Sequence, residues 1–277
     1  NDFRDEMIFS IDPVGAQDLD DAVSIKKLPN GNWEIGVHIT NVSHYVKPRS
    51  HLFQHAAKNT TSLYVANTVI PLYPEILSNG IFSLNEGVDR LTKSNIYEVN
   101  QDGEIVSFRV CDSIINSKKK MNYDDVNRII LTGEVPVGYE PFVEDINEMW
   151  IVAQKMIEAA KKQGRVTIDS NELYNEYDED GNIIESEKRQ ALPAQLIIEY
   201  FMVGANCKNA EYIDPKVVPF MYRVHEGPSV KKKKKAEAII KSMNIGIDNI
   251  KELCTPKRIR EFLISIQESD KFPLISR

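Results

Sequence analysis

The first half of the chain alternates apolar and polar side chains in the manner of β-strands. In residues 33 to 40 every second side chain is apolar, which is the period of a half-buried strand. A Pro-Asn-Gly-Asn sequence at 29 to 32 precedes this strand and predicts a hairpin with the β-prone residues 22 to 26. Residues 91 to 99 and 104 to 115 form a second pair of the same kind around a glycine turn.

In the second half of the chain the apolar residues follow a helical period. Residues 143 to 163 show this spacing, and Gly164 stands where a C-terminal cap is expected. A further helix at 191 to 210 is apolar nearly all round, which is typical of a buried helix. Between the strand pairs, residues 50 to 90 are expected to form short helices and loops. The order of these elements predicts an α+β fold in which the strands come first.

Four aspartates stand close together between two β-prone segments near the start of the chain. Asp12 ends the first segment, turn-forming residues follow, and Asp18, Asp20 and Asp21 lead into the second. Because side chains alternate in an extended chain, Asp18 and Asp20 share a face, whereas Asp21 points elsewhere unless the backbone bulges. The four carboxylates are therefore expected at one end of a strand pair.

This arrangement is typical of a metal site. Crowded carboxylates raise one another's pKa values unless a positive charge lies between them. Mg²⁺ prefers oxygen ligands and usually binds a few carboxylates together with water and phosphate oxygens. The alternative is that the aspartates are solvated turn residues, because Asp is common in turns.

Residues 10 to 23, Ser-Ile-Asp-Pro-Val-Gly-Ala-Gln-Asp-Leu-Asp-Asp-Ala-Val, resemble the signature of the catalytic RNB domain of the ribonuclease II and ribonuclease R exoribonucleases. Later blocks resemble the family's landmarks in the same order, and the resemblance covers nearly the whole chain. Within the family we favour the bacterial ribonuclease R branch. The later blocks are residues 36 to 46, 61 to 64, 70 to 75, 82 to 84, 89 to 90, 123 to 126, 198 to 206 and 222 to 228.

The resemblance implies a single RNB catalytic domain over residues 1 to 277. In this α+β fold a mixed sheet in the N-terminal half packs against helices mostly from the C-terminal half. The implied activity is that of a 3′-to-5′ exoribonuclease, which hydrolyses single-stranded RNA processively to nucleoside 5′-monophosphates with one or two Mg²⁺ ions. In such two-metal hydrolysis one ion activates water and the other stabilises the leaving oxygen.

The resemblance also assigns roles to individual residues. We expect Asp12 and Asp21 to hold the more tightly bound ion. Asp18 and Asp20 complete the catalytic site, with Asp20 the most sensitive to substitution. Tyr64 matches a residue that stacks on the RNA away from the scissile end, a type of contact common in single-strand binding.

Two further residues are implied to bind RNA. Tyr123 matches a residue that contacts the terminal nucleotides, and Glu199 matches one that contacts the ribose hydroxyl and distinguishes RNA from DNA. Apart from the resemblance, Glu199 lies in the apolar helix on the same stripe as Leu196 and Val203, so we expect a buried carboxylate. A buried carboxylate needs a partner, which is either a structural salt bridge or a hydrogen bond from the backbone.

Some positions depart from the family pattern. Asn59 stands where many members have an arginine, Asn41 replaces a common aspartate, and Ile168 falls near an aromatic that stacks on the terminal base. The family's closing Ser-Pro-Ile-Arg-Arg block, one arginine of which assists catalysis, would come after Arg277. We likewise expect no flanking cold-shock or S1 domain. We therefore expect an incomplete catalytic domain with impaired turnover.

The charge of the chain argues against nucleic-acid binding only mildly. The net charge is −7, although phosphate contacts need Lys and Arg. Basic residues are clustered, however, at 118 to 120 and 231 to 235. Such runs are typical of solvated helix faces, and a groove for RNA is the alternative.

Cysteines and apolar runs exclude several classes of protein. Cys111, Cys207 and Cys254 are far apart and form no CxxC pair, so neither a zinc site nor a disulfide framework is indicated. His38, His44 and His225 lie in family blocks and are expected to be structural. No signal peptide and no bilayer-spanning apolar run is found in the sequence. We expect a cytoplasmic monomer that binds neither a membrane nor a small-molecule cofactor.

Two other functions remain open. A catalytically silent RNA-binding fragment of such an enzyme would bind single-stranded RNA without releasing mononucleotides. A metal-dependent transferase that uses an Asp-x-Asp motif on a nucleotide sugar would account for the aspartates, but for none of the later blocks.

Overall fold

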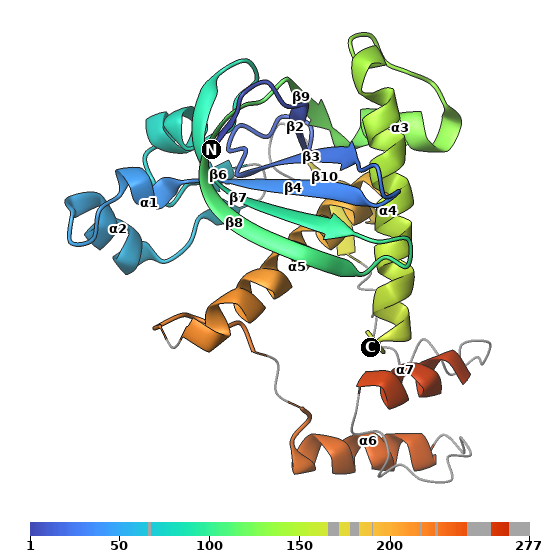
Figure 1. Cartoon of the computed structure of the whole chain (residues 1–277). Coiled ribbons are helices and arrows are strands. Elements are labelled where there is room, and N and C mark those ends of the chain that lie inside the picture. Colours follow the sequence, from blue (N-terminus) through green and yellow to red (C-terminus); the bar gives the residue numbers. More distant parts are fainter. Residues whose placement is uncertain are drawn as a thin grey trace.

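A seven-stranded sheet occupies the N-terminal part of the protein (Figure 1). The computed structural model describes residues 1–65, 68–165, 172–177, 183–189, 191–216, 218–224, 227–242 and 256–265. The strand order is β1-β8-β7-β4-β3-β2-β9, antiparallel from β2 to β8, with β1 and β9 added in parallel at the two edges. The strands are β1 (Asp2–Phe3), β2 (Ile8–Asp12), β3 (Asp21–Lys27), β4 (Trp33–Thr40), β7 (Asp89–Val99), β8 (Ile105–Asn116) and β9 (Lys119–Asn122).

The helices come mostly after the sheet, so the predicted α+β fold with a mixed sheet is confirmed. Figure 1 shows α4 and α5 lying across the sheet, whereas α6 and α7 lie apart from it. The helices are α1 (Val42–Tyr45), α2 (His51–Asn59), α3 (Tyr123–Thr132), α4 (Val143–Lys162), α5 (Pro193–Ile213), α6 (Val230–Ser242) and α7 (Pro256–Ser265), with shorter turns η1 (Ile76–Ile81), η2 (Glu140–Phe142) and η3 (Asp214–Lys216). Of the helices described, none has both the length and the apolar character needed to cross a bilayer.

Two small hairpins were not predicted from the sequence. They are β5 (Leu63–Val65) with β6 (Thr68–Ile70), and β10 (Glu172–Tyr177) with β11 (Ile183–Arg189). The strands of the first hairpin have three residues each, too few for an apolar period to stand out. The rest of residues 50 to 90 forms short helices and loops, as expected, in the part of that segment that the structure describes.

The two predicted hairpins and the predicted helix cap are confirmed. The β3–β4 turn has Gly31 at φ 85° and the β7–β8 turn has Gly103 at φ 80°, a backbone conformation that favours glycine. At the end of α4 the Arg165 amide donates to the Ala160 carbonyl at 2.9 Å. Gly164 has φ 92° there, which is the geometry of a Schellman cap.

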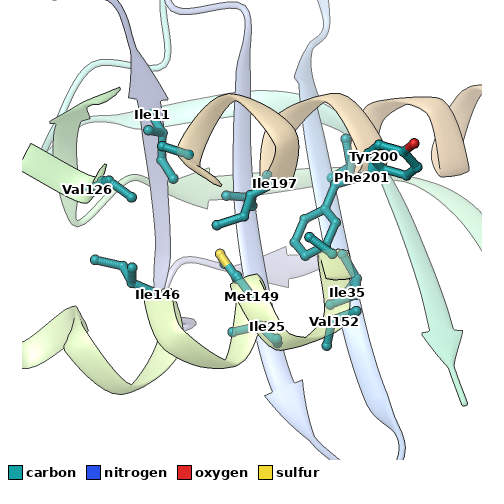
Figure 2. Packing of buried hydrophobic residues seen from close by; sticks show 14 of the residues in the cluster. Ile11, Ile25, Ile35, Val126, Ile146, Met149, Val152, Ile197, Tyr200 and Phe201 are labelled. Carbon is teal, nitrogen blue, oxygen red and sulfur yellow. The ribbon is translucent and has the colours of Figure 1, made fainter. Parts of the chain in front are cut away.

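One face of the sheet forms the main hydrophobic core. On β3 and β4 the residues of this face pair across the strands, as Val23 does with Val37 and Ile25 with Ile35. Helices α3, α4 and α5 cover this face, and each large apolar side chain buried there contributes about 1.5–3 kcal/mol. Figure 2 shows side chains of the strands and of all three helices meeting in one layer, among them Ile11, Val126, Ile146, Met149, Ile197 and Phe201.

The opposite face carries a smaller cluster and a buried polar network. Its apolar members are Ile8, Leu19, Ala22, Leu84 and Ile115, and we call this group the second cluster. The His38 ring lies on the same face and bonds the hydroxyls of Ser94 and Ser24 at 2.6 and 3.1 Å. Burial lowers the pKa of His38 to about 3, so the ring stays neutral. The structural role expected for His38 is consistent with these contacts, and His225 lies outside the described residues.

The two lysine runs differ in structure. Lys231 to Lys235 lie exposed on α6, as expected for a solvated helix face. The expectation is wrong for 118 to 120, because Lys119 and Lys120 belong to the edge strand β9. Lysines on an edge strand discourage pairing with another chain.

Gly103→Ala should destabilise the fold more than Gly87→Ala. Both glycines have positive φ, where a Cβ costs about 1–2 kcal/mol. At Gly103 the added Cβ would also collide with the Lys155 carbonyl of α4, whereas at Gly87 no described residue lies within 4 Å. Urea unfolding should show an additional loss of about 1–3 kcal/mol for Gly103→Ala. Equal losses for the two variants would contradict close packing of the β7–β8 turn on α4.

Candidate metal centre

The four aspartates lie where β2 ends and β3 begins. Asp12 is the last residue of β2 and Asp21 the first of β3, and these strands run antiparallel beside each other. Their connection contains a turn in which the Ala16 amide donates to the Pro13 carbonyl at 3.1 Å. The predicted loop between two strands is confirmed, and it brings Asp12 and Asp21 to the same end of the sheet.

Leu19 determines the direction of the side chains around it. It is fully buried in the second cluster, and its carbonyl accepts a hydrogen bond from the Leu84 amide at 2.9 Å. Asp18 is partly buried and Asp20 is exposed on either side of it. Because side chains alternate along an extended segment, the inward Leu19 directs both neighbours away from the second cluster.

Burial and mutual repulsion raise the pKa values of three of the four carboxylates, those of Asp12, Asp20 and Asp21. Burial raises the pKa of Asp12 to about 6, and the charges of Asp18 and Asp20 add to the rise. Burial also raises the pKa of Asp21 to about 6, with contributions from Asp12 and Asp20. Partial desolvation and the charge of Asp18 raise the pKa of Asp20. Each of these three carboxylates therefore senses the charge of at least one other aspartate.

The donor set fits a hard divalent cation. Among the described residues the buried Oδ2 of Asp12 has no hydrogen-bond partner, which is costly for a carboxylate oxygen. Within the part of the chain that the structure describes, no three Asp, Glu, His or Cys side chains lie close enough together to hold a metal ion by themselves. Mg²⁺ usually takes one or two carboxylates and completes its shell with water and phosphate oxygens. Asp12 and Asp21 would supply the one or two carboxylates that such a site takes.

Tyr123 lies beside the buried aspartates. Strand β9 runs parallel to β2 and pairs Asn122 with Asp12, so α3 starts next to the aspartates. The Asn122 side chain caps α3 by accepting a hydrogen bond from the Asp125 amide at 2.8 Å. Burial raises the pKa of Tyr123 to about 12, and the charges of Asp12 and Asp21 contribute. The phenol therefore remains protonated at neutral pH.

Tyr64 lies near the other two aspartates. It belongs to the β5–β6 hairpin, where it pairs with Val69, and its side chain is 71% exposed. Partial burial and the charges of Asp18 and Asp20 raise the pKa of its hydroxyl. The structure thus brings two of the three residues expected to bind RNA close to the aspartates.

The expectation of a buried Glu199 is wrong. Its carboxylate is 46% exposed and accepts a hydrogen bond from Arg165 Nη2 at 2.8 Å. Helix α5 has two apolar stripes, and the one with small residues and Phe201 faces the sheet. The stripe of Leu196 and Val203, which includes Glu199, is therefore only partly buried. The predicted salt bridge is confirmed, and no interaction described here joins Glu199 to the aspartates.

Lys120 is a site residue that the sequence did not identify. Its ammonium donates to the carbonyl of Ala16 in the aspartate loop, and its amide donates to Glu86 Oε2 at 2.9 Å. Its charge lowers the pKa of Asp12, although burial has the larger and opposite influence. The lysine run was visible in the sequence, but the parallel pairing of β9 with β2 was not.

Comparisons with known proteins identify the family of this chain. A family model described as "RNB domain" matches residues 1–277. Ribonuclease R of Thermotoga maritima is 46% identical over 228 residues, which are 82% of this chain and 32% of that protein. Ribonuclease R 1 of Lactococcus lactis is 40% identical over 82% of this chain and 28% of its own length. The chain spans about a third of the length of these curated relatives.

Solved structures show the same fold. The structure titled "Mycoplasma genitalium RNase R in complex with ribose methylated single-stranded RNA" superposes with a TM-score of 0.93 at 25% identity, over 100% of this chain and 43% of that chain. The structure of yeast Ssd1, described as a pseudonuclease, has a TM-score of 0.76 at 17% identity, over 100% of this chain and 33% of that chain. The second likeness shows the fold alone. The predicted resemblance to ribonuclease R is confirmed.

Asp21→Asn should stabilise the protein at neutral pH in EDTA. Because folding raises the pKa of Asp21 from about 4 to about 6, the folded state binds more protons in this window and loses stability as the pH rises through it. An amide avoids this loss, which is about 2–3 kcal/mol for such a shift. Urea unfolding should show the gain at about pH 7.5 and little gain at about pH 4.

Asp112→Asn is the matched control for this measurement. Asp112 is exposed, and a hydrogen bond from Lys93 lowers its pKa, so the same substitution should slightly destabilise the protein at neutral pH. A gain for Asp21→Asn of equal size at both pH values would contradict a destabilising buried charge at this position.

Proposed function

This chain belongs to the RNB domain family, and we propose that it carries the catalytic site of a 3′-to-5′ exoribonuclease. The substrate is single-stranded RNA and the products are nucleoside 5′-monophosphates. The observation that carries the proposal is the partly buried aspartate cluster between β2 and β3, with a protonated phenol and an exposed aromatic ring beside it. The similarity to ribonuclease R proteins supports it.

Asp12 and Asp21 are the proposed ligands of the more tightly held Mg²⁺, and Asp18 and Asp20 are the further proposed metal ligands that complete the site. A bound Mg²⁺ would supply Lewis-acid stabilisation of the charge that develops on the phosphate oxygens during hydrolysis. The unsatisfied Oδ2 of Asp12 and the raised pKa values of Asp12 and Asp21 are the features of a site that gains from a cation. The more exposed Asp20 can reach substrate or water at the rim of the cluster.

The two tyrosines are proposed to hold the end of the RNA. The Tyr64 ring is accessible, and stacking of such a ring on a base contributes about 1–3 kcal/mol. The Tyr123 hydroxyl remains protonated at neutral pH and can donate a hydrogen bond to a phosphate oxygen next to Asp12 and Asp21. Together the rings would place the terminal phosphodiester over the carboxylates.

Glu199 is the proposed recognition residue for the ribose. Its exposed carboxylate can accept a hydrogen bond from a 2′-hydroxyl, which DNA lacks. Arg165 bonds one oxygen of the carboxylate and leaves the other free to accept. Because Glu199 makes no contact with the aspartates in the described residues, it would act on a sugar and not on the reacting phosphate.

Asp20→Asn should abolish hydrolysis while leaving RNA binding intact. The change removes one negative charge from the aspartate cluster and does not alter the tyrosines. We therefore expect a loss of turnover on the order of 100-fold or more. A uniformly radiolabelled single-stranded RNA, incubated with Mg²⁺, measures the release of mononucleotides. A fluorescence anisotropy titration in EDTA measures binding.

Asp5→Asn changes the net charge by the same amount at an exposed position and should retain both activities. Retained hydrolysis in Asp20→Asn would refute the site. Binding of RNA by the unchanged chain without release of mononucleotides would instead identify a catalytically silent RNA-binding domain.

A further inference from the structure

Ser83 touches the aspartate loop on both sides of Asp18. Its hydroxyl accepts a hydrogen bond from the Leu19 amide at 3.0 Å and donates one to the Gln17 carbonyl at 2.7 Å. The serine is 0% exposed and lies more than sixty residues along the chain from the loop. One hydroxyl therefore fixes the backbone before and after a proposed metal ligand.

The segment that carries Ser83 is itself firmly held. Arg90 Nε donates to the Ser83 carbonyl at 2.8 Å, and Arg90 Nη2 donates to the Gly80 carbonyl at 3.0 Å. Phe82, just before Ser83, is buried and packs edge-on against Tyr73 with ring centroids 5.3 Å apart. Ser83 therefore lies in a segment that Arg90 and ring packing hold in place, and its hydroxyl fixes the aspartate loop relative to this segment.

Two more hydrogen bonds join the same segment to the aspartate loop. The Asn79 side chain donates to Gln17 Oε1 at 3.0 Å, and the Leu84 amide donates to the Leu19 carbonyl at 2.9 Å. Gln17 is therefore bonded to residues 79 and 83, and Leu19 to residues 83 and 84, while Asp18 lies between these two anchored residues.

We propose that Ser83 is a positioning residue that sets the affinity of the aspartate cluster for a divalent cation. It does so by holding Asp18, and through Leu19 also Asp20, in place beside Asp12. This inference rests on the proposed metal site. A residue that orients a ligand without touching the metal typically changes affinity about 10- to 100-fold when it is removed.

Ser83→Ala tests the proposal, with Ser113→Ala as the matched control. Ser113 is also a buried serine, and its hydroxyl bonds Thr92 and Ser94 at a distance from the loop. Calorimetric titration with Mn²⁺ and with Mg²⁺ should show binding weakened about 10-fold or more in Ser83→Ala and unchanged in Ser113→Ala. Both variants should lose similar thermal stability.

Amide hydrogen exchange gives a readout that does not depend on metal or activity. In Ser83→Ala the Leu19 amide should lose protection, because its acceptor is gone, while the Leu84 amide keeps its own acceptor. Asn79→Ala, which removes only one side-chain contact to Gln17, should weaken metal binding in the same direction by a smaller factor. This milder variant preserves the test if Ser83→Ala does not fold.

If the Leu19 amide loses its protection in Ser83→Ala but the metal affinity is unchanged, Ser83 does not have the positioning role. An equal loss of affinity in Ser113→Ala would also overturn it, because the effect would then be general destabilisation. If the unchanged chain binds neither cation, the proposed metal site itself fails, and with it the inference. The exchange experiment distinguishes this case, since the Leu19 amide would still depend on Ser83.

Discussion

The repulsion between the partly buried carboxylates is the interaction that the rest of the structure has to oppose. Asp12 and Asp21 are held together by the pairing of β2 with β3, and the surrounding protein removes much of the water that would otherwise screen them. Such a cluster is unfavourable for the isolated chain and becomes favourable when a cation shares it. The core of the sheet and its helices supplies the stability that keeps these charges in place.

The two faces of the sheet have different roles. One face packs against α3, α4 and α5 to form the main core, while Leu19 and Leu84 pack on the other face and so anchor the aspartate loop to the sheet. The edge strand β9 adds Lys120 at the loop and leads directly into Tyr123. A single sheet therefore positions the carboxylates, the ammonium of Lys120 and the ring of Tyr123, although these residues come from two separate parts of the sequence.

Much of the fold could be predicted because its signals are local. The β3–β4 hairpin, helix α4 and the Gly164 cap follow from alternation, helical period and a glycine in the right place. The site was harder to predict. Glu199 was expected to be buried because α5 has two apolar stripes, and local sequence does not tell which stripe faces the sheet. Lys120 and Ser83 act on the aspartate loop only through contacts between distant segments, which no local pattern reveals.

The anchoring of Leu19 restricts how the length of the aspartate loop can vary. Between Asp12 and Gln17 the chain makes an exposed turn, so an extra residue there could bulge into solvent. Between Asp18 and Asp21 an extra residue would invert the alternation, place a carboxylate against Ile8 and Ala22, and expel the leucine. Length variation among related proteins should therefore be confined to the first part of the loop, with the second part fixed in spacing.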